Sequence, residues 1–448
     1  MKLDDKRLVC SDEKILKIKE SIKATRSKRE HQICRVIELK VVKKRLSKKQ
    51  IEDISKMFLE AKWFYNYLLS KSEKENIPLS KINTTSIKEI IKLDRDKNEI
   101  VVPLEQLSAQ CKQKILARML ANLKTMKILF KSGKQKTKEN LKFKSEVNCI
   151  PLKQFGNSYS FKGERKVKIS GISGKLLIRG WKQIDFENME FADAKLIRKP
   201  DGLYLQVTTY IDEEKILKVE SNGQEIGIDF GCQDNLTFSD GRKVNVQVEE
   251  SERLKKLQMQ LNRRQTKRSN NRNKTIQKIR REYQKIVNKK KDKANKVCSE
   301  LKKYELVVIQ DEQLANWKKI GHGKKIQHSC LGTIKTKLKS YSNVIVLERF
   351  IPTTKFCSNC GKKLDLKLWD RTFKCSCGVK MDRDVHAAKN MLEIFHLVDE
   401  YMVHNNFVPA DYREVKLVDF KKAISGTKRF QKEHLKDEAR RCNVFSVA

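Results

Sequence analysis

Long apolar runs are missing from this chain of 448 residues. No stretch of 18 apolar residues occurs anywhere, so no segment has the composition of a membrane-spanning helix. The first residues, MKLDDKRLVCSDEK, are charged throughout and lack the apolar segment that a secretory signal requires. We therefore expect a protein that neither inserts into a membrane nor is secreted.

Acidic residues are few relative to basic ones. Lys and Arg number 99 against 56 Asp and Glu, which gives a formal net charge of +43. This excess is far larger than solubility requires, and it predicts a polyanionic partner. Hydrophobic residues still make up 39% of the chain, which excludes a simple disordered basic tail. At about 150 residues per domain, the length predicts roughly three domains.

The twelve cysteines do not have the setting of a disulfide framework, because the chain is not expected to be secreted. Four of them form two knuckles, Cys357-x₂-Cys360 and, after fourteen residues, Cys375-x-Cys377. Four thiolates suit a closed tetrahedral site for one structural Zn²⁺. A glycine follows each knuckle, where a tight turn toward a metal needs one. The pattern predicts a zinc ribbon, and a redox pair or chance spacing are the alternatives.

The N-terminal third combines a strand with helices. Residues 1–32 are polar and basic without a clear period, which favours a flexible or partner-ordered arm. The alternating, β-branched run at 34–42 predicts a strand. Ser47 and Gln50 form a capping box that opens a helix, and a second helical pattern covers about 104–131.

Residues 150–220 have a different pattern, in which six glycines separate short β-rich runs. This pattern is typical of a small β-barrel or sandwich. The strand at 34–42 can belong to the same barrel, with the helical segment inserted into it.

Buried strands and a basic helical pair follow from residue 223. Strands are predicted in QEIGIDFG, YELVVIQDEQL and NVIVLE. Residues 251–300 hold 18 Lys and Arg against four Asp and Glu, with apolar residues at helical spacing, so they predict a basic helical hairpin. Contact with a nucleic-acid backbone is one interpretation of this charge, and a solvated pair of charged helices is the other.

Three carboxylates occupy strand ends and a helix start. Asp229 lies at the end of the strand in EIGID, Glu312 follows LVVIQ, and Asp384 opens the helix DVHAAKNML. Such positions can converge at one edge of a sheet, and divalent cations prefer hard oxygen ligands. Two Mg²⁺ ions roughly 4 Å apart would activate a water and stabilise the leaving oxygen of a phosphodiester. The alternative is that each carboxylate is a surface or capping residue.

Two of these assignments have a neighbouring competitor. Side chains alternate along a strand, so Gln310 and Glu312 are expected on one side and Asp311 on the other. We therefore prefer Glu312 as the middle acid and keep Asp311 as the alternative. Asp384 is preferred to Asp382 because two alanines follow it and let the helix pack close to the sheet.

The motifs GIDFG, VVIQDEQL, CSNC…CSCG and DRDVHAAKNM occur in this order. Together they resemble the RuvC-like nuclease of transposon-encoded TnpB proteins and of miniature type V-F CRISPR effectors. A zinc ribbon between the second and third catalytic acids is the most specific feature of that family. The motifs cover about 225–395, whereas 33–220 matches by architecture only. The family has an E-D-L motif where this chain has Gln310, so either Glu312 takes the catalytic role or the site is impaired.

The resemblance implies a multidomain α+β protein. It would combine an RNase H-like (RuvC) α/β nuclease carrying a zinc ribbon insert with a β-barrel wedge domain and an α-helical recognition block. In chain order the expected parts are a flexible basic arm (1–32), a wedge strand (33–46), the recognition block (47–135), the wedge barrel (136–220), the first part of the nuclease with the basic hairpin (221–356), the zinc ribbon (357–378), the last part of the nuclease (379–400) and a C-terminal tail (401–448).

The activity implied by the resemblance is RNA-guided cleavage of double-stranded DNA. A guide RNA reads the target by base pairing, and the protein reads a short flanking motif. The implied catalytic residues are Asp229, Glu312 and Asp384 with two Mg²⁺, and the cysteines hold one Zn²⁺. The expected protein is a monomer, or a homodimer on one guide RNA, in the prokaryotic cytoplasm and on the nucleoid when bound to DNA. The alternatives are a nuclease-dead guided repressor and a transposase accessory protein.

Overall fold

The computed structural model describes residues 12–93, 98–134, 141–216, 220–264, 269–357, 359–367, 369–405 and 413–426. The chain divides into two compact units, Met1–Leu217 and Lys218–Ala448. Each unit has its own sheet and its own hydrophobic core. Among the described helices, none has both the length and the apolar composition that crossing a bilayer requires.

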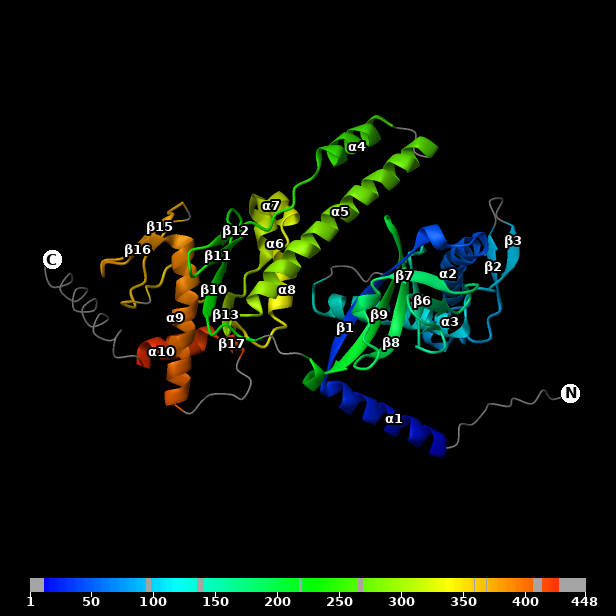
Figure 1. Ribbon diagram of the computed structural model, residues 1–448, viewed down its shortest axis with the longest axis horizontal. Helices are drawn as coiled ribbons and strands as arrows, with labels where there is room; N and C mark the ends of the chain where they lie inside the picture. The colour runs from blue at the N-terminus through cyan, green and yellow to red at the C-terminus, as the bar shows by residue number, and fades with distance from the viewer. Residues whose placement is uncertain are drawn as a thin grey trace. The chain divides into compact units, whose positions relative to one another are not determined.

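A seven-stranded sheet in the order β4-β8-β9-β1-β7-β6-β5 forms the centre of the first unit (Figure 1). Strand β1 pairs antiparallel with β9 on one side and with β7 on the other. This pairing confirms that the early strand joins the β-rich segment that follows the helices. The strands are β1 (Gln32–Val41), β4 (Cys149–Leu152), β5 (Tyr159–Phe161), β6 (Lys166–Ile169), β7 (Leu176–Arg179), β8 (Glu190–Lys199) and β9 (Gly202–Asp212).

Helices α2 (Lys48–Lys74) and α3 (Ala109–Lys131) pack in the same core as this sheet. The capping box at the start of α2 is confirmed, because the Ser47 and Gln50 side chains each bond the other's backbone. Short 3₁₀ helices complete the unit: η1 (Lys43–Arg45), η2 (Leu79–Lys81), η3 (Trp181–Gln183) and η4 (Glu213–Lys215).

Two expectations for the first unit need correction. The segment 47–135 is not wholly helical, because β2 (Glu89–Leu93) and β3 (Glu99–Pro103) form an antiparallel hairpin from β-branched runs. Part of the expected flexible arm is helix α1 (Asp12–Glu30), while residues 1–11 lie outside the described residues. Helix α1 contains no glycine or proline and is rich in straight-chain Lys and Glu, which favour helix without an apolar period.

The second unit has a six-stranded sheet in the order β12-β11-β10-β13-β14-β17. Strands β10, β13, β14 and β17 are parallel, and β11 and β12 extend the sheet antiparallel beyond β10. The strands are β10 (Glu225–Phe230), β11 (Leu236–Phe238), β12 (Lys243–Val244), β13 (Leu306–Gln310), β14 (Val344–Leu347) and β17 (Glu414–Val415).

Helices cover both faces of this sheet. Val307 and Ile309 of β13 pack in one core with residues of α5 and α8, and Val308 packs in another core with residues of α9 and α10. Such alternation is what a strand buried on both faces requires. The helices are α4 (Glu252–Arg263), α5 (Asn270–Leu301), α6 (Leu314–Trp317), the π-helix η5 (Lys318–His322), α7 (Gly323–His328), α8 (Leu331–Leu338), α9 (Arg383–His404) and α10 (Leu417–Gly426).

Two further predictions concern the basic hairpin and the C-terminal tail. The basic hairpin is confirmed as α4 and α5, which pack through Leu254, Leu257 and Ile279 (Figure 1). The tail expected from residue 401 is partly wrong, since β17 extends the sheet and α10 adds Phe420 to the core beside α9. The β17 segment is too short for a strand period to be visible in the sequence. Residues 406–412 and 427–448 lie outside the described residues.

Candidate active site and metal centre

Asp229 is placed by the close packing of β10 against helix α9. Along β10, Ile226, Ile228 and Phe230 enter one core, so Gly227 and Asp229 are on the opposite side. A Cβ atom on Gly227 would lie 1.9 Å from the carbonyl oxygen of Ala388 in α9. Only glycine permits this approach, which brings the first turn of α9 to the side of the sheet that Asp229 occupies.

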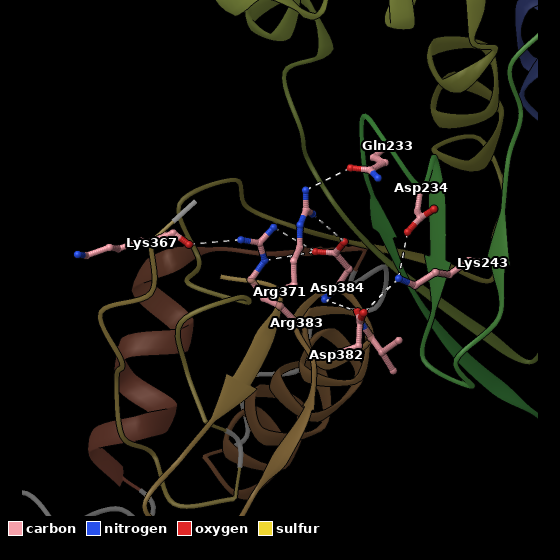
Figure 2. Close-up of polar contacts among 9 residues, drawn as sticks. Gln233, Asp234, Lys243, Lys367, Arg371, Asp382, Arg383 and Asp384 are labelled. Carbon is pink, nitrogen blue, oxygen red and sulfur yellow. Dashed lines mark hydrogen bonds and ion pairs between the residues drawn. The ribbon is translucent and has the colours of Figure 1, made fainter. Parts of the chain in front are cut away.

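The first turn of α9 contains the two competing aspartates. Asp382 is the N-cap, and its Oδ1 accepts the backbone N–H of Asp384 at 2.9 Å and of Val385 at 3.1 Å. Its Oδ2 lies 3.1 Å from Lys243 Nζ (Figure 2). Asp382 therefore has a capping role, which leaves Asp384 as the aspartate of this pair that interacts with Asp229.

Two arginines lie beside Asp384. Arg383 donates from Nε to Asp384 Oδ1 at 3.3 Å, and Arg371 NH1 lies 3.9 Å from Asp384 Oδ2. Figure 2 shows both guanidinium groups directed toward this carboxylate, and Arg371 also donates to the Gln233 side chain at 3.2 Å. Neither arginine was predicted from the sequence. The position of Arg383 between two aspartates was the available signal for one of them.

Burial and the charges of two neighbouring acids act on Asp229. Burial, followed by the charges of Asp384 and Glu312, raises the pKa of Asp229 well above its usual value, and Arg383 opposes this shift. Burial also raises the pKa of Glu312, against the charges of Lys335 and Arg349. Carboxylates that repel one another in a buried site are stabilised by a bound cation.

Asp311 is turned to the other face of the sheet. Its Oδ1 lies 2.8 Å from Lys335 Nζ and 2.6 Å from Lys339 Nζ, both on α8. Burial would raise the pKa of Asp311, but these two lysines outweigh burial and lower it. Gln310 points to the α9 side instead, where it bonds the loop after β14. Asp311 is therefore paired with two lysines of α8, on the face of the sheet opposite to Asp229.

The four predicted cysteine ligands lie together. Their Sγ atoms are within 4.8 Å of one another, with 3.6 Å between Cys357 and Cys377 and 3.5 Å between Cys360 and Cys375. These separations are too long for disulfides, whose sulfur atoms lie about 2 Å apart. Within the described part of the chain, this is the one group of three or more Cys, His, Asp or Glu side chains compact enough to hold a metal ion. Asp229, Glu312 and Asp384 do not form such a compact group.

The local backbone around the cysteines is also as expected. Gly361 and Gly378 have positive φ angles of 76° and 98°. Their N–H groups donate to the carbonyls of Cys357 at 2.7 Å and Cys375 at 3.1 Å, which closes the two turns. Cys375 and Cys377 lie in the turn of a hairpin formed by β15 (Thr372–Lys374) and β16 (Lys380–Asp382), and β16 leads directly into α9. A closed set of four sulfur ligands fits a structural zinc.

An aromatic stack joins the cysteine cluster to α9. Phe373 is fully buried with Cys357 and Cys360, and its ring lies 3.4 Å from the His386 ring at an interplanar angle of 13°. Burial, followed by the charge of Lys389, lowers the pKa of His386 to about 4, so this side chain is neutral at pH 7. This contact was not predicted from the sequence, although His386 lies only two residues after Asp384.

Two protein-family models match parts of this chain. A "Probable transposase" model (OrfB_IS605) matches residues 207–321, and a "Cas12f1-like, TNB domain" model matches residues 331–391. The first range holds Asp229 and Glu312, and the second holds Asp384 and all four clustered cysteines.

These matches relate residues 207–321 and 331–391 of the chain to the TnpB/Cas12f family. A relative from Streptomyces pristinaespiralis, described as a putative RNA-guided DNA endonuclease, is 27% identical over 305 residues, or 57% of this chain and 74% of the relative. The TnpB-like proteins L79 and L770 of Acanthamoeba polyphaga mimivirus are 28% identical over 211 residues, which are 39% of this chain and 38% of each viral protein.

Comparison with solved structures gives a match of low structural similarity. The cryo-EM structure of a Cas12f1–sgRNA–target DNA complex covers 80% of this chain and 98% of its own, at 15% identity and a TM-score of 0.23. The TnpB/Cas12f assignment therefore depends on the sequence matches.

Proposed function

We propose that this chain is an RNA-guided DNA endonuclease that hydrolyses phosphodiester bonds at the edge of the six-stranded sheet. The observation that carries the proposal is that Asp384 and Glu312 lie near enough to Asp229 for both of their charges to act on its carboxylate. The S. pristinaespiralis relative, described as a putative RNA-guided DNA endonuclease, supports it.

Asp229, Glu312 and Asp384 would hold two Mg²⁺ ions in this proposal. When bound, these ions would activate a water molecule and stabilise the leaving oxygen. The carboxylates fit such ions because they are hard oxygen donors whose mutual repulsion a cation relieves. Arg383 and Arg371 place positive charge beside Asp384, where it can orient a phosphate of the DNA strand.

The remaining parts have proposed roles of their own. The four cysteines would hold one structural Zn²⁺ in the ribbon at 357–378. The first unit would supply the wedge (33–46 and 136–220) and the recognition block (47–135). The α4–α5 hairpin would contact the backbone of the guide RNA or of its duplex with DNA, because it carries much of the positive charge. The protein would act as a monomer, or as a homodimer on one guide RNA.

A guided repressor without nuclease activity is the second candidate. Gln310 favours it, because the family resemblance places a catalytic glutamate at this position. The structure gives Gln310 a buried packing position, so Glu312 is the acid that we propose for catalysis.

Alanine variants of the acids test the proposed chemistry. Asp229→Ala, Glu312→Ala and Asp384→Ala should each lower the rate of target cleavage by at least about a hundredfold, because each removes a ligand of the ions that would activate water and stabilise the leaving oxygen. Guided target binding should survive, since base pairing and backbone contacts supply its free energy. Asp311→Ala is the matched control, and it should keep partial activity. Cleavage and binding are measured with the native guide and Mg²⁺.

The same experiment can contradict these assignments. An inactive Asp311→Ala together with an active Glu312→Ala would make Asp311 the middle ligand. Full activity in Asp229→Ala or Asp384→Ala would remove the proposed site altogether.

A further inference from the structure

A buried amide from β13 holds the loop that follows β14. The Gln310 side chain is 4% exposed, and its Nε2 donates to the carbonyl of Ile351 at 2.7 Å. The same nitrogen lies 3.2 Å from the carbonyl of Arg349 and 3.3 Å from that of Glu348. The carbonyls of Glu348 and Ile351 also accept the backbone N–H groups of Ile351 at 3.1 Å and Thr353 at 2.9 Å, so Gln310 adds a buried side-chain donor to a turn that the backbone already closes.

A second buried amide holds the same loop from the opposite direction. Asn390 of α9 is fully buried, and its Nδ2 donates to the carbonyl of Thr353 at 2.7 Å and also to the carbonyl of Phe356. The Thr353 hydroxyl donates to Gln310 Oε1 at 2.9 Å. Thr353 thus joins β13 through its side chain and α9 through its backbone.

These contacts connect β13, α9 and the loop that leads to the cysteine cluster. Gln310 is the last residue of β13, two positions before Glu312. Asn390 lies in the helix whose first turn carries Asp384. The loop that they hold ends at Phe356, immediately before Cys357. A change in this network would alter the separation between the carboxylates of two different elements.

We propose that Gln310, Thr353 and Asn390 form a positioning clamp that sets the separation of Glu312 and Asp384. This inference rests on the proposed function, because it assumes that these carboxylates bind metal. The clamp residues are positioning residues, since none of them is placed to contact the reacting phosphate. Metal sites require their ligands to be held within about 0.5 Å, and loss of supporting hydrogen bonds typically costs about 10- to 100-fold in affinity or activity. Gln310 is then a required part of the site and not a defect in it.

The test compares Thr353→Val, which removes the hydroxyl at constant shape, with Thr353→Ser, which keeps it. Thr209→Val is the matched control, because Thr209 is equally buried in the first unit and its hydroxyl also donates to a backbone carbonyl, that of Arg35 at 3.1 Å. Two quantities are measured. One is the Mg²⁺ concentration that gives half-maximal cleavage by the guide-loaded protein, and the other is Mn²⁺ binding to the RNA-free full chain by paramagnetic resonance, relative to Asp229→Ala.

Thr353→Val should raise both the half-maximal Mg²⁺ concentration and the Mn²⁺ dissociation constant by about tenfold or more, with target binding unchanged. Thr353→Ser and Thr209→Val should stay within about twofold of the unmutated protein. Gln310→Met should raise both quantities as Thr353→Val does. Agreement between two different substitutions would show that the effect is not a folding defect of one variant.

Unchanged metal dependence in folded Thr353→Val and Gln310→Met would overturn the clamp. Failure of both variants to fold would overturn it too, because the network would then be a folding element. An unmutated protein that binds Mn²⁺ more tightly than Asp229→Ala but never cleaves DNA would refute the proposed function alone, and the clamp would then be judged on Mn²⁺ binding. If the unmutated protein and Asp229→Ala bind Mn²⁺ equally, both the metal site and the clamp are refuted.

Discussion

Gly227 is the residue on which the contact between β10 and α9 depends. Its missing Cβ makes room for the carbonyl of Ala388, and Asp229 and Asp384 lie close to that contact. Gly227→Ala should therefore push α9 away from the sheet. We expect it to lower stability by about 1–3 kcal/mol, the usual cost of overpacking a core, and to reduce cleavage more than target binding.

Gly332→Ala in α8 is the control for that substitution. The nearest atom to its added Cβ would be a Leu314 methyl carbon at 3.9 Å, which is ordinary contact. Because alanine is the better helix former, this variant should be neutral or more stable by up to about 1 kcal/mol. Thermal unfolding of both variants checks the comparison, and a Gly227→Ala protein as stable and active as Gly332→Ala would refute the role given to this glycine.

Residues whose chemistry follows from their neighbours in the chain could be predicted from the sequence. The grouping of the cysteines followed from their spacing, and their sulfur atoms do lie together. The preference for Asp384 over Asp382 followed from the two alanines after it and stays a prediction, although Asp382 does cap α9. The contacts of Gln310 and Arg371 could not be predicted, because their partners come from distant segments that only the folded chain brings together.

At the scale of elements, the cysteine cluster supports the start of α9 through the stack of Phe373 on His386. Cys360→Ser removes one of the four sulfur ligands, so the zinc content should fall from about one ion per chain toward zero. Stability should fall with it, and the first turn of α9 should exchange its amide hydrogens faster. Metal analysis and hydrogen exchange give these two measurements.

Cys34→Ser is the control for the ribbon, because Cys34 is an exposed thiol on β1. It should keep the full zinc content and the unmutated exchange pattern. A folded and active protein without zinc, or a Cys360→Ser variant that retains it, would contradict the assignment of the cysteines.

Strong local signals made most elements predictable. The Ser47 capping box and the leucine spacing of the basic hairpin each led to a helix that the structure contains. Helix α1, the β2–β3 hairpin and strand β17 were missed for physical reasons. Helix α1 has no apolar face to give a period, and β17 is a two-residue strand whose pairing with β14 is set by tertiary contacts.

At the scale of the whole molecule, the net charge of +43 should govern nucleic-acid affinity. Replacing Lys274 and Lys278, both exposed on α5, by Gln should weaken RNA binding and reduce the slope of log affinity against log salt by about one per lost phosphate contact. Replacing the exposed Lys421 and Lys422 of α10 changes the net charge equally and should leave this slope unchanged. Titrations at several salt concentrations distinguish the two pairs, and equal effects would make the hairpin a merely solvated helical pair.

The central claim is that this protein cuts DNA where a guide RNA directs it. The most direct test incubates the unmutated protein and its native guide with Mg²⁺ and either a matching target or a scrambled one, and measures binding and strand cleavage in the same samples. Our account predicts tight binding and cleavage of the matching target only, with cleavage but not binding lost when Mg²⁺ is chelated. Tight, guide-dependent binding without cleavage in Mg²⁺ would contradict the account and leave the guided repressor in its place.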